Sequence, residues 1–289
     1  MNILVTGAGG FIGSRLVEMA QPEFGVKTLS LRNKEISTPD LNGADVIIHL
    51  AGKAHEMKKI NEQAYYDINY TLTKKLADKA VQKHIPHFIY ISTLKVYGDE
   101  TDIILNENSP CQPTDAYGKS KLQAEEYLQS LQPEIKVAIV RPPLVYGAGV
   151  KGNMLRMLNL CSKNIPLPFA KAGNKRSMVF IDNLIELIFA ICRQQKAGVF
   201  LPADDKALST DELLAYMQKA FKNNTSLVSL PPGLRYLLKK IRPALYKRLF
   251  QSLVVDNVQT NNMLNFIPPY HPKEGIATMV NWYKRLHKL

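Results

Sequence analysis

The stretch NILVTGAGGFIG, residues 2–13, decides the fold of this chain. Its first five residues form an apolar run typical of a buried strand, and an apolar helical pattern follows at 11–20. A glycine-rich turn connects the two segments. A turn of this kind, placed between a strand and a helix, is the context in which such a motif binds a dinucleotide. The chain is therefore expected to begin with a dinucleotide-binding unit.

Each glycine in the spacing Gly7-x-x-Gly10-x-x-Gly13 has its own predicted role. Gly7 permits a sharp turn out of the strand, Gly10 lets the backbone approach a pyrophosphate, and Gly13 lets the helix pack closely on the strand. The N–H groups at the start of the helix, where Phe11 and Ile12 stand, would then face the phosphates. These five residues are the predicted phosphate-binding part of the site.

Strand-like and helix-like segments continue to alternate after this unit. Further strands are expected at 26–31, 45–50, 87–92 and 136–141, and helices at 63–83 and 116–132. This alternation predicts an α/β fold, a Rossmann-like doubly wound parallel sheet. Only residues 32–44 separate the second strand from the third, so this part of the nucleotide-binding half is expected to be shortened.

Prolines punctuate the chain after Arg141, where strands and helices become shorter. We expect a dinucleotide-binding Rossmann domain at 1–145 and, at 146–289, a small C-terminal α/β lobe that mainly binds the substrate. Some segments of this second part are expected to return to the Rossmann core.

The composition is ordinary for a globular protein, with 46% hydrophobic and 21% charged residues among 289. No apolar run approaches the roughly 18 residues of a membrane span, and the first strand begins at residue 2, which leaves no room for a signal peptide. The cysteines, Cys111, Cys161 and Cys192, are far apart and have no histidine at metal-binding spacing. We expect a cytoplasmic protein with buried or half-buried thiols, no integral membrane segment and no metal.

The formal net charge of +12 indicates anionic partners. The Lys and Arg residues are scattered, and aromatic and basic residues do not interleave as in a single-strand nucleic-acid platform. A phosphorylated cofactor and an anionic small substrate would use the charge equally well. We therefore expect small anionic ligands as partners and no nucleic acid.

The end of the second predicted strand bears on the choice of dinucleotide. NAD sites usually place an acidic residue there, whereas an arginine accommodates the 2′-phosphate of NADP. The sequence SLRN, residues 30–33, offers no acid, and the Arg32 guanidinium could hold a phosphate through two hydrogen bonds. This favours NADP over NAD as cofactor, with a solvated surface arginine as the alternative interpretation of Arg32.

Tyr117 and Lys121 form a second motif. They are four residues apart, so their side chains lie on one face of the helix predicted there. A free phenol has a pKa of about 10, and a neighbouring ammonium lowers it. Following a glycine loop, the pair predicts a tyrosine acid/base beside a dinucleotide.

Seven segments together carry a resemblance to a known family. They are TGAGGFIG (6–13), HLAG (49–52), the helix with Asn69, ISTLKVYG (91–98), YGKSK (117–121), RPPLVYG (141–147) and RSMVFIDN (176–183). With these, almost the whole chain resembles the extended short-chain dehydrogenase/reductase family, of the NAD-dependent epimerase/dehydratase type, whose members act on nucleotide sugars. The resemblance implies an enzyme with a UDP-linked sugar as substrate and a possible homodimer through a four-helix contact.

The resemblance also implies a role for each catalytic residue. Tyr117 would be the general acid/base for a sugar hydroxyl, while Lys121 would lower the pKa of Tyr117 and bond the nicotinamide ribose. Thr93 would hydrogen-bond the reacting oxygen, with its neighbour Ser92 as a weaker candidate. Asn69 would support the lysine through a water. The plainer alternatives are a strand-end hydroxyl for Thr93 and a surface amide for Asn69.

Further positions are assigned by the same resemblance. Leu50, Ala51 and Gly52 of the HLAG run join the cofactor-binding residues. Arg176 would contact the substrate diphosphate, with a solvated surface charge as the alternative, and Lys151 and Asn153 are the predicted nucleotide contacts. Arg248 is expected near a phosphate of the substrate.

The segment 233–250 is basic and amphipathic. It holds six basic residues and no acidic ones, and its leucines and tyrosines recur at helix-like spacing. The favoured interpretation is a helix of the small lobe that covers the substrate cleft. The alternative is a helix that lies on a membrane surface.

The reaction type is narrowed by the residues after Thr93. Dehydratases of the family carry Asp-Glu there, whereas this chain has Leu94-Lys95, which argues against a dehydratase. Arg32 favours an NADPH-dependent reductase acting on the 4-keto group of a UDP-4-keto-6-deoxy-N-acetylhexosamine, similar to quinovosamine-type 4-ketoreductases of surface-polysaccharide synthesis. A UDP-sugar 4-epimerase with tightly bound NAD is the alternative. A non-catalytic NADP-sensing protein is a further alternative. The presence of Tyr117, Lys121 and Thr93 argues against it, because a sensor has no need for an acid/base.

Overall fold

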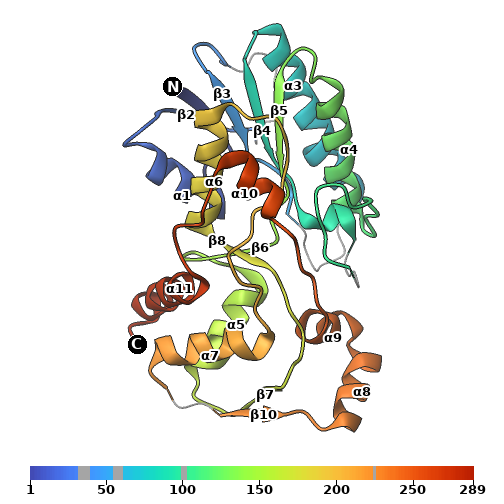
Figure 1. Cartoon of the computed structure of the whole chain (residues 1–289), viewed down its shortest axis with the longest axis vertical. Helices are drawn as coiled ribbons and strands as arrows, with labels where there is room; N and C mark the ends of the chain where they lie inside the picture. The colour runs from blue at the N-terminus through green and yellow to red at the C-terminus, as the bar shows by residue number, and fades with distance from the viewer. Residues whose placement is uncertain (32–39, 55–60, 99–102, 224–225) are drawn as a thin grey trace.

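The computed structural model describes residues 1–31, 40–54, 61–98, 103–223 and 226–289 (Figure 1). Its centre is a six-stranded parallel sheet in the order β2-β1-β3-β4-β5-β9. The strands are β1 (Asn2–Thr6), β2 (Gly25–Leu29), β3 (Val46–His49), β4 (His87–Ile91), β5 (Lys136–Val140) and β9 (Gly198–Phe200). The Rossmann-like α/β fold predicted from the sequence is confirmed.

Helices cover both faces of this sheet because its strands are apolar on both sides. In β1, Ile3 and Val5 pack toward α1 (Phe11–Ala20) and α6 (Ile181–Gln194), whereas Leu4 packs on the opposite face. That opposite face is covered by α3 (Leu72–Gln82) and α4 (Ala116–Ser130) (Figure 1). Continuous apolar strands with helices on both faces are what a parallel sheet requires.

The order in which strands are added to the sheet changes direction between β1 and β3, although all the strands run parallel. The chain leaves β1 for β2 on one side and returns to pair β3 on the other side of β1. Such a switch point leaves a crevice at the carboxyl ends of the two strands, where ligands bind in open α/β sheets. The glycine loop follows β1 and residues 50–52 follow β3, so both lie at this position.

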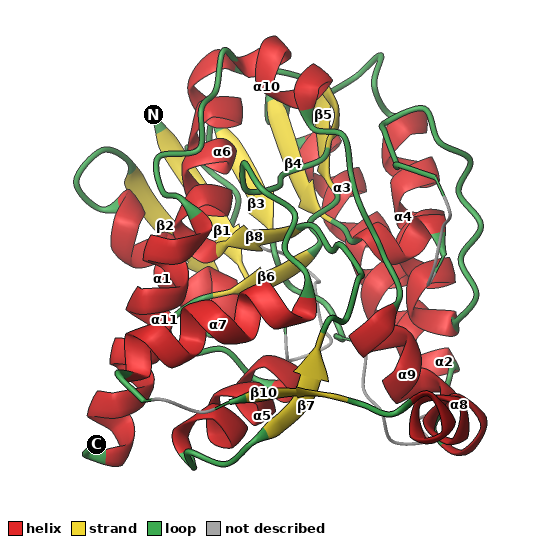
Figure 2. Ribbon diagram, turned by 60° about the horizontal axis from the view of Figure 1, so that its bottom comes forward, coloured by secondary structure: helices red, strands yellow, loops and turns green. Residues whose placement is uncertain are grey.

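A smaller group of elements lies below the carboxyl edge of the sheet (Figure 2). Two short parallel pairs, β6–β8 and β7–β10, are surrounded by helices. The strands are β6 (Leu144–Tyr146), β7 (Leu167–Ala170), β8 (Met178–Phe180) and β10 (Leu227–Ser229). The helices are α5 (Gly152–Ser162), α7 (Thr210–Phe221), α8 (Pro232–Ile241), α9 (Pro243–Phe250) and α11 (Pro272–His287), while α10 (Val258–Leu264) packs beside α6. None of the helices in the described ranges combines the length and apolar sequence that a membrane crossing needs.

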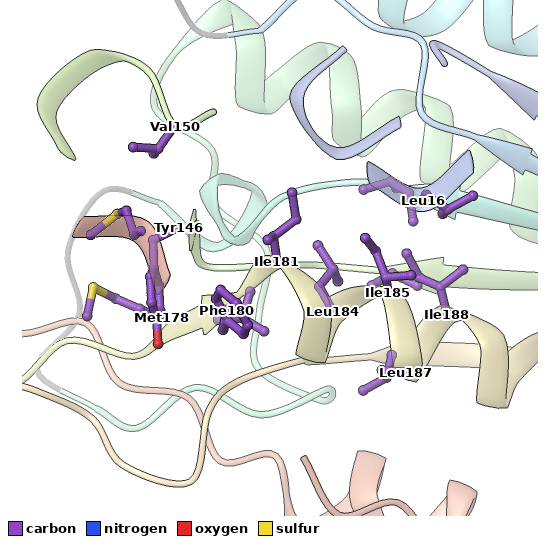
Figure 3. Close-up of a cluster of buried hydrophobic side chains, with 14 of the residues drawn as sticks. Leu16, Tyr146, Val150, Met178, Phe180, Ile181, Leu184, Ile185, Leu187 and Ile188 are labelled. Atoms are coloured by element: carbon purple, nitrogen blue, oxygen red, sulfur yellow. The ribbon is translucent and has the colours of Figure 1, made fainter. Parts of the chain in front are cut away.

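One hydrophobic core connects the sheet to the smaller elements. Helix α6 begins directly after β8 and runs back along the sheet, with most of its side chains buried. Figure 3 shows Ile185 and Ile188 of α6 near Leu16 of α1, with Phe180 and Tyr146 at the other end of the same cluster. The lobe is therefore fixed to the sheet through α6.

The cysteines are unpaired, as predicted. Cys161 and Cys192 are buried, and burial raises the pKa of each thiol to about 12. Cys111 is half-buried, and burial raises its pKa as well. The thiols therefore stay protonated near neutral pH, the unreactive form.

Helix α11 docks on the β6–β8 pair through a glycine. A Cβ on Gly275 would lie 2.7 Å from Phe180 and 2.9 Å from the Tyr146 hydroxyl. Gly275→Ala should therefore lower the free energy of unfolding by about 1–2 kcal/mol, since overpacking outweighs the roughly 1 kcal/mol gained in helix propensity.

Gly233→Ala is the matched control, because Gly233 is also helical and a Cβ there meets nothing within 4 Å. It should leave the protein as stable or stabilise it slightly. Urea unfolding of both variants checks this, and equal effects of the two substitutions would contradict the docking contact.

Candidate active site

The glycine loop has no room for side chains at two of its three glycines. A Cβ on Gly13 would lie 2.2 Å from the Gly7 carbonyl oxygen, and one on Gly7 would lie 2.6 Å from the Ala51 nitrogen. Gly7 also has a φ of +74°, a conformation that glycine adopts without strain. The loop thus brings α1 and the end of β3 close against the end of β1.

The N-terminus of α1 is open to an anion. Gly10 is the N-cap residue, no side chain caps the helix, and no acidic residue stands in its first turn. The first N–H groups of a helix have no partner within the helix, and the helix dipole favours negative charge there. The shape and the donors therefore fit a dinucleotide pyrophosphate, as predicted for these residues.

A buried histidine links the cofactor loop to the helix that follows β3. The His49 Nδ1 lies 2.6 Å from Thr6 Oγ1, and its Nε2 lies 2.8 Å from Thr73 Oγ1. Thr73 donates its hydrogen to the Asn69 carbonyl, so it accepts from His49, which therefore carries its hydrogen on Nε2. Burial lowers the pKa of His49 to about 3, and the ring stays neutral. Thr6 also accepts from the Ala51 N–H, which fixes residues 50–52 beside the glycine loop.

Tyr117 lies in the first turn of α4, close to Thr93. Asp115 caps this helix by accepting from the Gly118 N–H at 2.7 Å. Burial raises the pKa of Tyr117 to about 12, while a hydrogen bond with the Thr93 side chain acts in the opposite direction. Thr93 therefore forms a hydrogen bond with the predicted acid/base. The alternative interpretation, a hydroxyl that only ends a strand, does not account for this contact. The ring of Tyr65 lies edge-on to that of Tyr117, with centroids 6.0 Å apart.

Lys121 is buried one turn further along α4. Its Nζ donates to the Ile91 carbonyl at 2.7 Å and lies 4.0 Å from the centre of the Tyr90 ring. Burial lowers the pKa of Lys121 to about 7, and the charge of Glu125 partly offsets this. The Lys121 amine is therefore held in a low-dielectric position against Ile91 and Tyr90, where a charge acts strongly.

Asn69 is buried, which excludes the surface-amide alternative. It lies in η1 (Tyr66–Thr71), a π-helical turn that joins α2 (Gln63–Tyr65) to α3, so the predicted helix 63–83 is not a regular one. The Asn69 amide accepts from the Lys53 N–H at 2.8 Å and donates to the Ser120 hydroxyl at 3.1 Å. It thereby joins the loop after β3 to α4 between Tyr117 and Lys121.

A buried charged pair lies behind Lys121. Arg141 donates to Glu125 through Nε at 3.0 Å and Nη2 at 2.5 Å, and through Nη1 to the Tyr97 hydroxyl at 2.6 Å. Ser92 donates to Glu125 as well, so its hydroxyl serves this network, and Thr93 is the residue that reaches Tyr117. The sequence reasoning missed Glu125, although its position four residues after Lys121 places it on the same helix face.

Apart from Thr93, three predicted substrate residues have described side chains, and their binding role stays a prediction. Lys151 is exposed and lines a cavity of about 480 Å³ together with Gly9, Gly10 and Phe11 of the glycine loop. Asn153 is exposed in the first turn of α5. Arg176 is half-buried and donates to the Gln251 carbonyl at 3.1 Å.

Two predicted residues cannot be assigned contacts. Arg248 belongs to α9, but its side chain is outside the described part of the structure. Arg32 lies outside the described residues altogether. Across the described ranges, no group of three or more His, Cys, Asp or Glu side chains is placed to hold a metal ion.

Curated proteins of known name are similar over nearly the full chain. The chain is 33% identical to the UDP-glucose 4-epimerase of Vibrio cholerae, with 95% of this chain and 93% of that protein covered. It is 27% identical to the N-acetyl-alpha-D-glucosaminyl-diphospho-ditrans,octacis-undecaprenol 4-epimerase of Escherichia coli O157:H7, again over 95% and 93%.

Solved structures share the fold. The UDP-glucuronic acid 4-epimerase of Bacillus cereus, in complex with NAD, superposes with a TM-score of 0.79 at 21% identity and covers 99% of this chain. The UDP-glucose 4-epimerase of Thermotoga maritima gives a TM-score of 0.80 at 20% identity, with the same coverage.

The family comparison agrees with the motifs. Residues 3–200 match the family model described as the NAD dependent epimerase/dehydratase family, a span from the first strand of the sheet to its last. The glycine loop, the Tyr117–Lys121 face of α4 and Thr93 all lie within this span. With the relative at 33% identity, this shows that the chain is an enzyme of the NAD-dependent epimerase/dehydratase family.

Proposed function

We propose that the protein is a 4-epimerase acting on a sugar linked to a diphosphate, with a UDP-hexose as the first substrate class to test. The observation that carries the proposal is the set of half-buried Thr93 and Tyr117 with buried Lys121, beside a glycine loop that fits a pyrophosphate. The choice of epimerase rests on the names of the two relatives, both of which are 4-epimerases of diphosphate-linked sugars. Two features favoured an NADPH-dependent reductase: a resemblance to quinovosamine-type 4-ketoreductases, and Arg32, which lies outside the described residues.

In this reaction the sugar C4 loses a hydride and its hydroxyl proton, then regains both with the hydride arriving at the opposite face. When bound, NAD supplies the acceptor and then the donor of that hydride. The glycine loop and residues 50–52 would hold its phosphates and adjoining ribose, and Lys121 would bond the nicotinamide ribose, as the family resemblance implies.

Tyr117 carries the proton in this scheme. Its oxygen takes the proton from the C4 hydroxyl and later returns it, while Thr93 holds the reacting oxygen in line. Burial raises the pKa of Tyr117 to about 12 although the Thr93 hydrogen bond lowers it, and this value is too high for a base near neutral pH. In the proposed reaction the N-terminus of α4, where Tyr117 stands, and the Lys121 ammonium would lower it further.

The rest of the network positions Lys121. Glu125 favours the charged form of Lys121, because its negative charge partly offsets the cost of burial. Arg141 and Ser92 hold the Glu125 carboxylate in place. In this scheme these residues act through Lys121 as positioning residues.

Removal of the Tyr117 hydroxyl should stop turnover. Tyr117→Phe is expected to lower kcat for conversion of UDP-glucose to UDP-galactose by about 100-fold or more, because no other described group replaces the proton carrier. The matched control is Tyr127→Phe, which removes a phenol from the same helix on the side facing Lys74. Chromatography of the UDP-sugars after incubation measures both, and full turnover by Tyr117→Phe would refute the assignment.

The same assay separates the alternatives. An epimerase interconverts UDP-sugars without consuming added cofactor. Stoichiometric oxidation of NADPH by a UDP-4-keto-6-deoxy sugar, with no epimerisation, would establish the reductase. Cofactor binding without turnover of any sugar diphosphate would favour a sensor.

The burial of Lys121 predicts a pH-dependent stability. Its pKa is about 7 in the folded chain, against 10.5 ordinarily, so between these values the unfolded chain binds more protons. The contribution of Lys121 to stability therefore rises with pH across this window, and below pH 7 the folded chain bears the cost of a buried charge. Lys121→Met should raise Tm most at pH 6–7 and least near pH 10, while it abolishes turnover.

Lys119→Met is the control, because Lys119 stands on the same helix with an exposed side chain. Differential scanning fluorimetry across the pH range measures the effect. A gain in Tm that is independent of pH, or equal for the two variants, would contradict a pKa lowered by burial.

A further inference from the structure

Helix α8 turns an apolar face toward solvent. Leu234, Leu237 and Ile241 occupy one face, at the i, i+3 and i+7 positions, and are 52%, 48% and 63% exposed. A helix that covered a cleft with this face would bury these side chains. Instead α8 lies at the outer edge of the lobe, beside α9 (Figure 2).

The contacts of α8 with the protein come from its basic residues. The Arg235 guanidinium lies 4.5 Å from the centre of the Phe250 ring and donates to the Ala172 carbonyl at 3.4 Å. The Lys239 Nζ lies 5.8 Å from the ring of Tyr246 on α9. The half-buried Arg235 thus faces the lobe while the apolar side chains face solvent, which is the reverse of an ordinary surface helix.

The exposed face is bordered by positive charge. The segment 233–250 contains no acidic residue, and its six basic residues are Arg235, Lys239, Lys240, Arg242, Lys247 and Arg248. Lys239, Lys240 and Arg242 are exposed. An apolar face bordered by Lys and Arg is the pattern of a helix that lies in the interface of a bilayer containing anionic lipids.

We propose that α8 docks the protein on an anionic lipid bilayer. Leu234, Leu237 and Ile241 would insert among the acyl chains near the headgroups, and the neighbouring ammonium and guanidinium groups would reach the lipid phosphates. Long basic side chains suit this position, because their stems lie along apolar surface while their charged ends stay in water.

Charge distinguishes the bilayer from other occupants. A second copy of the chain would bring a net charge of +12 and an equally basic segment to the same contact, so the two would repel. A nucleic acid would satisfy the basic residues but leave the three apolar side chains in water. An anionic bilayer satisfies both parts of the surface.

The test is flotation of the full chain with lipid vesicles, which requires no turnover and so stands apart from the proposed reaction. Wild-type protein should float with vesicles of phosphatidylcholine and phosphatidylglycerol, and bind pure phosphatidylcholine weakly. Added salt should reduce the binding, because the attraction is partly electrostatic. The double variant Leu237→Glu/Ile241→Glu should bind the anionic vesicles at least about tenfold less.

Glutamate substitutions elsewhere on the surface show whether the loss of binding is specific to α8. Val258→Glu and Ile267→Glu place the same charge on side chains that are 59% and 86% exposed elsewhere on the surface. They should bind as the wild type does. All variants should keep the wild-type Tm and UDP-sugar turnover in solution, and Lys240→Glu, which leaves the apolar face intact, should also weaken binding.

Three results would overturn the proposal. The first is wild-type protein that stays unbound with the anionic vesicles at low salt. The second is equal binding by the wild type and the double variant. The third is a self-interface, seen in light scattering as a dimer mass that the double variant reduces to a monomer while vesicles have no effect.

Discussion

The buried ammonium of Lys121 is the constraint on which the rest of the site depends. A charge placed under a strand end is tolerated only where carbonyl oxygens, aromatic faces or carboxylates replace water. Ile91, Tyr90 and Glu125 provide one of each. Glu125 in turn needs Arg141, so a chain of compensating charges runs from the helix face into the sheet. The acid/base is thereby fixed by the core, and the surface loops have little part in it.

Hydrogen bonds also hold the two halves of the cofactor crevice together. The end of β1 and the end of β3 are joined through Thr6, His49 and Ala51. The next connection, through Thr73 and Asn69, reaches the loop at Lys53 and then α4 at Ser120. Each step is a hydrogen bond, and the side chains of Thr6, His49, Thr73 and Asn69 are buried. A ligand bound over the strand ends would therefore meet a preformed surface.

Local pattern predicted much of this arrangement, and contacts between distant segments supplied the rest. The glycine spacing and the four-residue separation of Tyr117 and Lys121 are local, so both could be recognised from the sequence, and the structure places them at strand and helix ends as expected. The pairing of Arg141 with Glu125 could not be predicted, since it depends on which helix packs behind β5. Strand β9 is only three residues long and carries no periodic signal, although it completes the sheet. The outward direction of the apolar face of α8 depends on its contacts with α9, which no pattern within α8 reveals.

The π-helical turn at Tyr66–Thr71 has a consequence for how this helix evolves. A π-turn holds one residue more than an α-helical turn, and each residue advances a helix by about 100°. The extra residue lets Asn69 face α4 while Leu76 and Ala80 downstream still face the sheet. A one-residue deletion here would restore a regular helix. It would rotate either Asn69 away from α4 or Leu76 and Ala80 away from the sheet. Substitutions at the exposed positions of this turn, Asp67 and Thr71, should therefore be tolerated more readily than any change in its length.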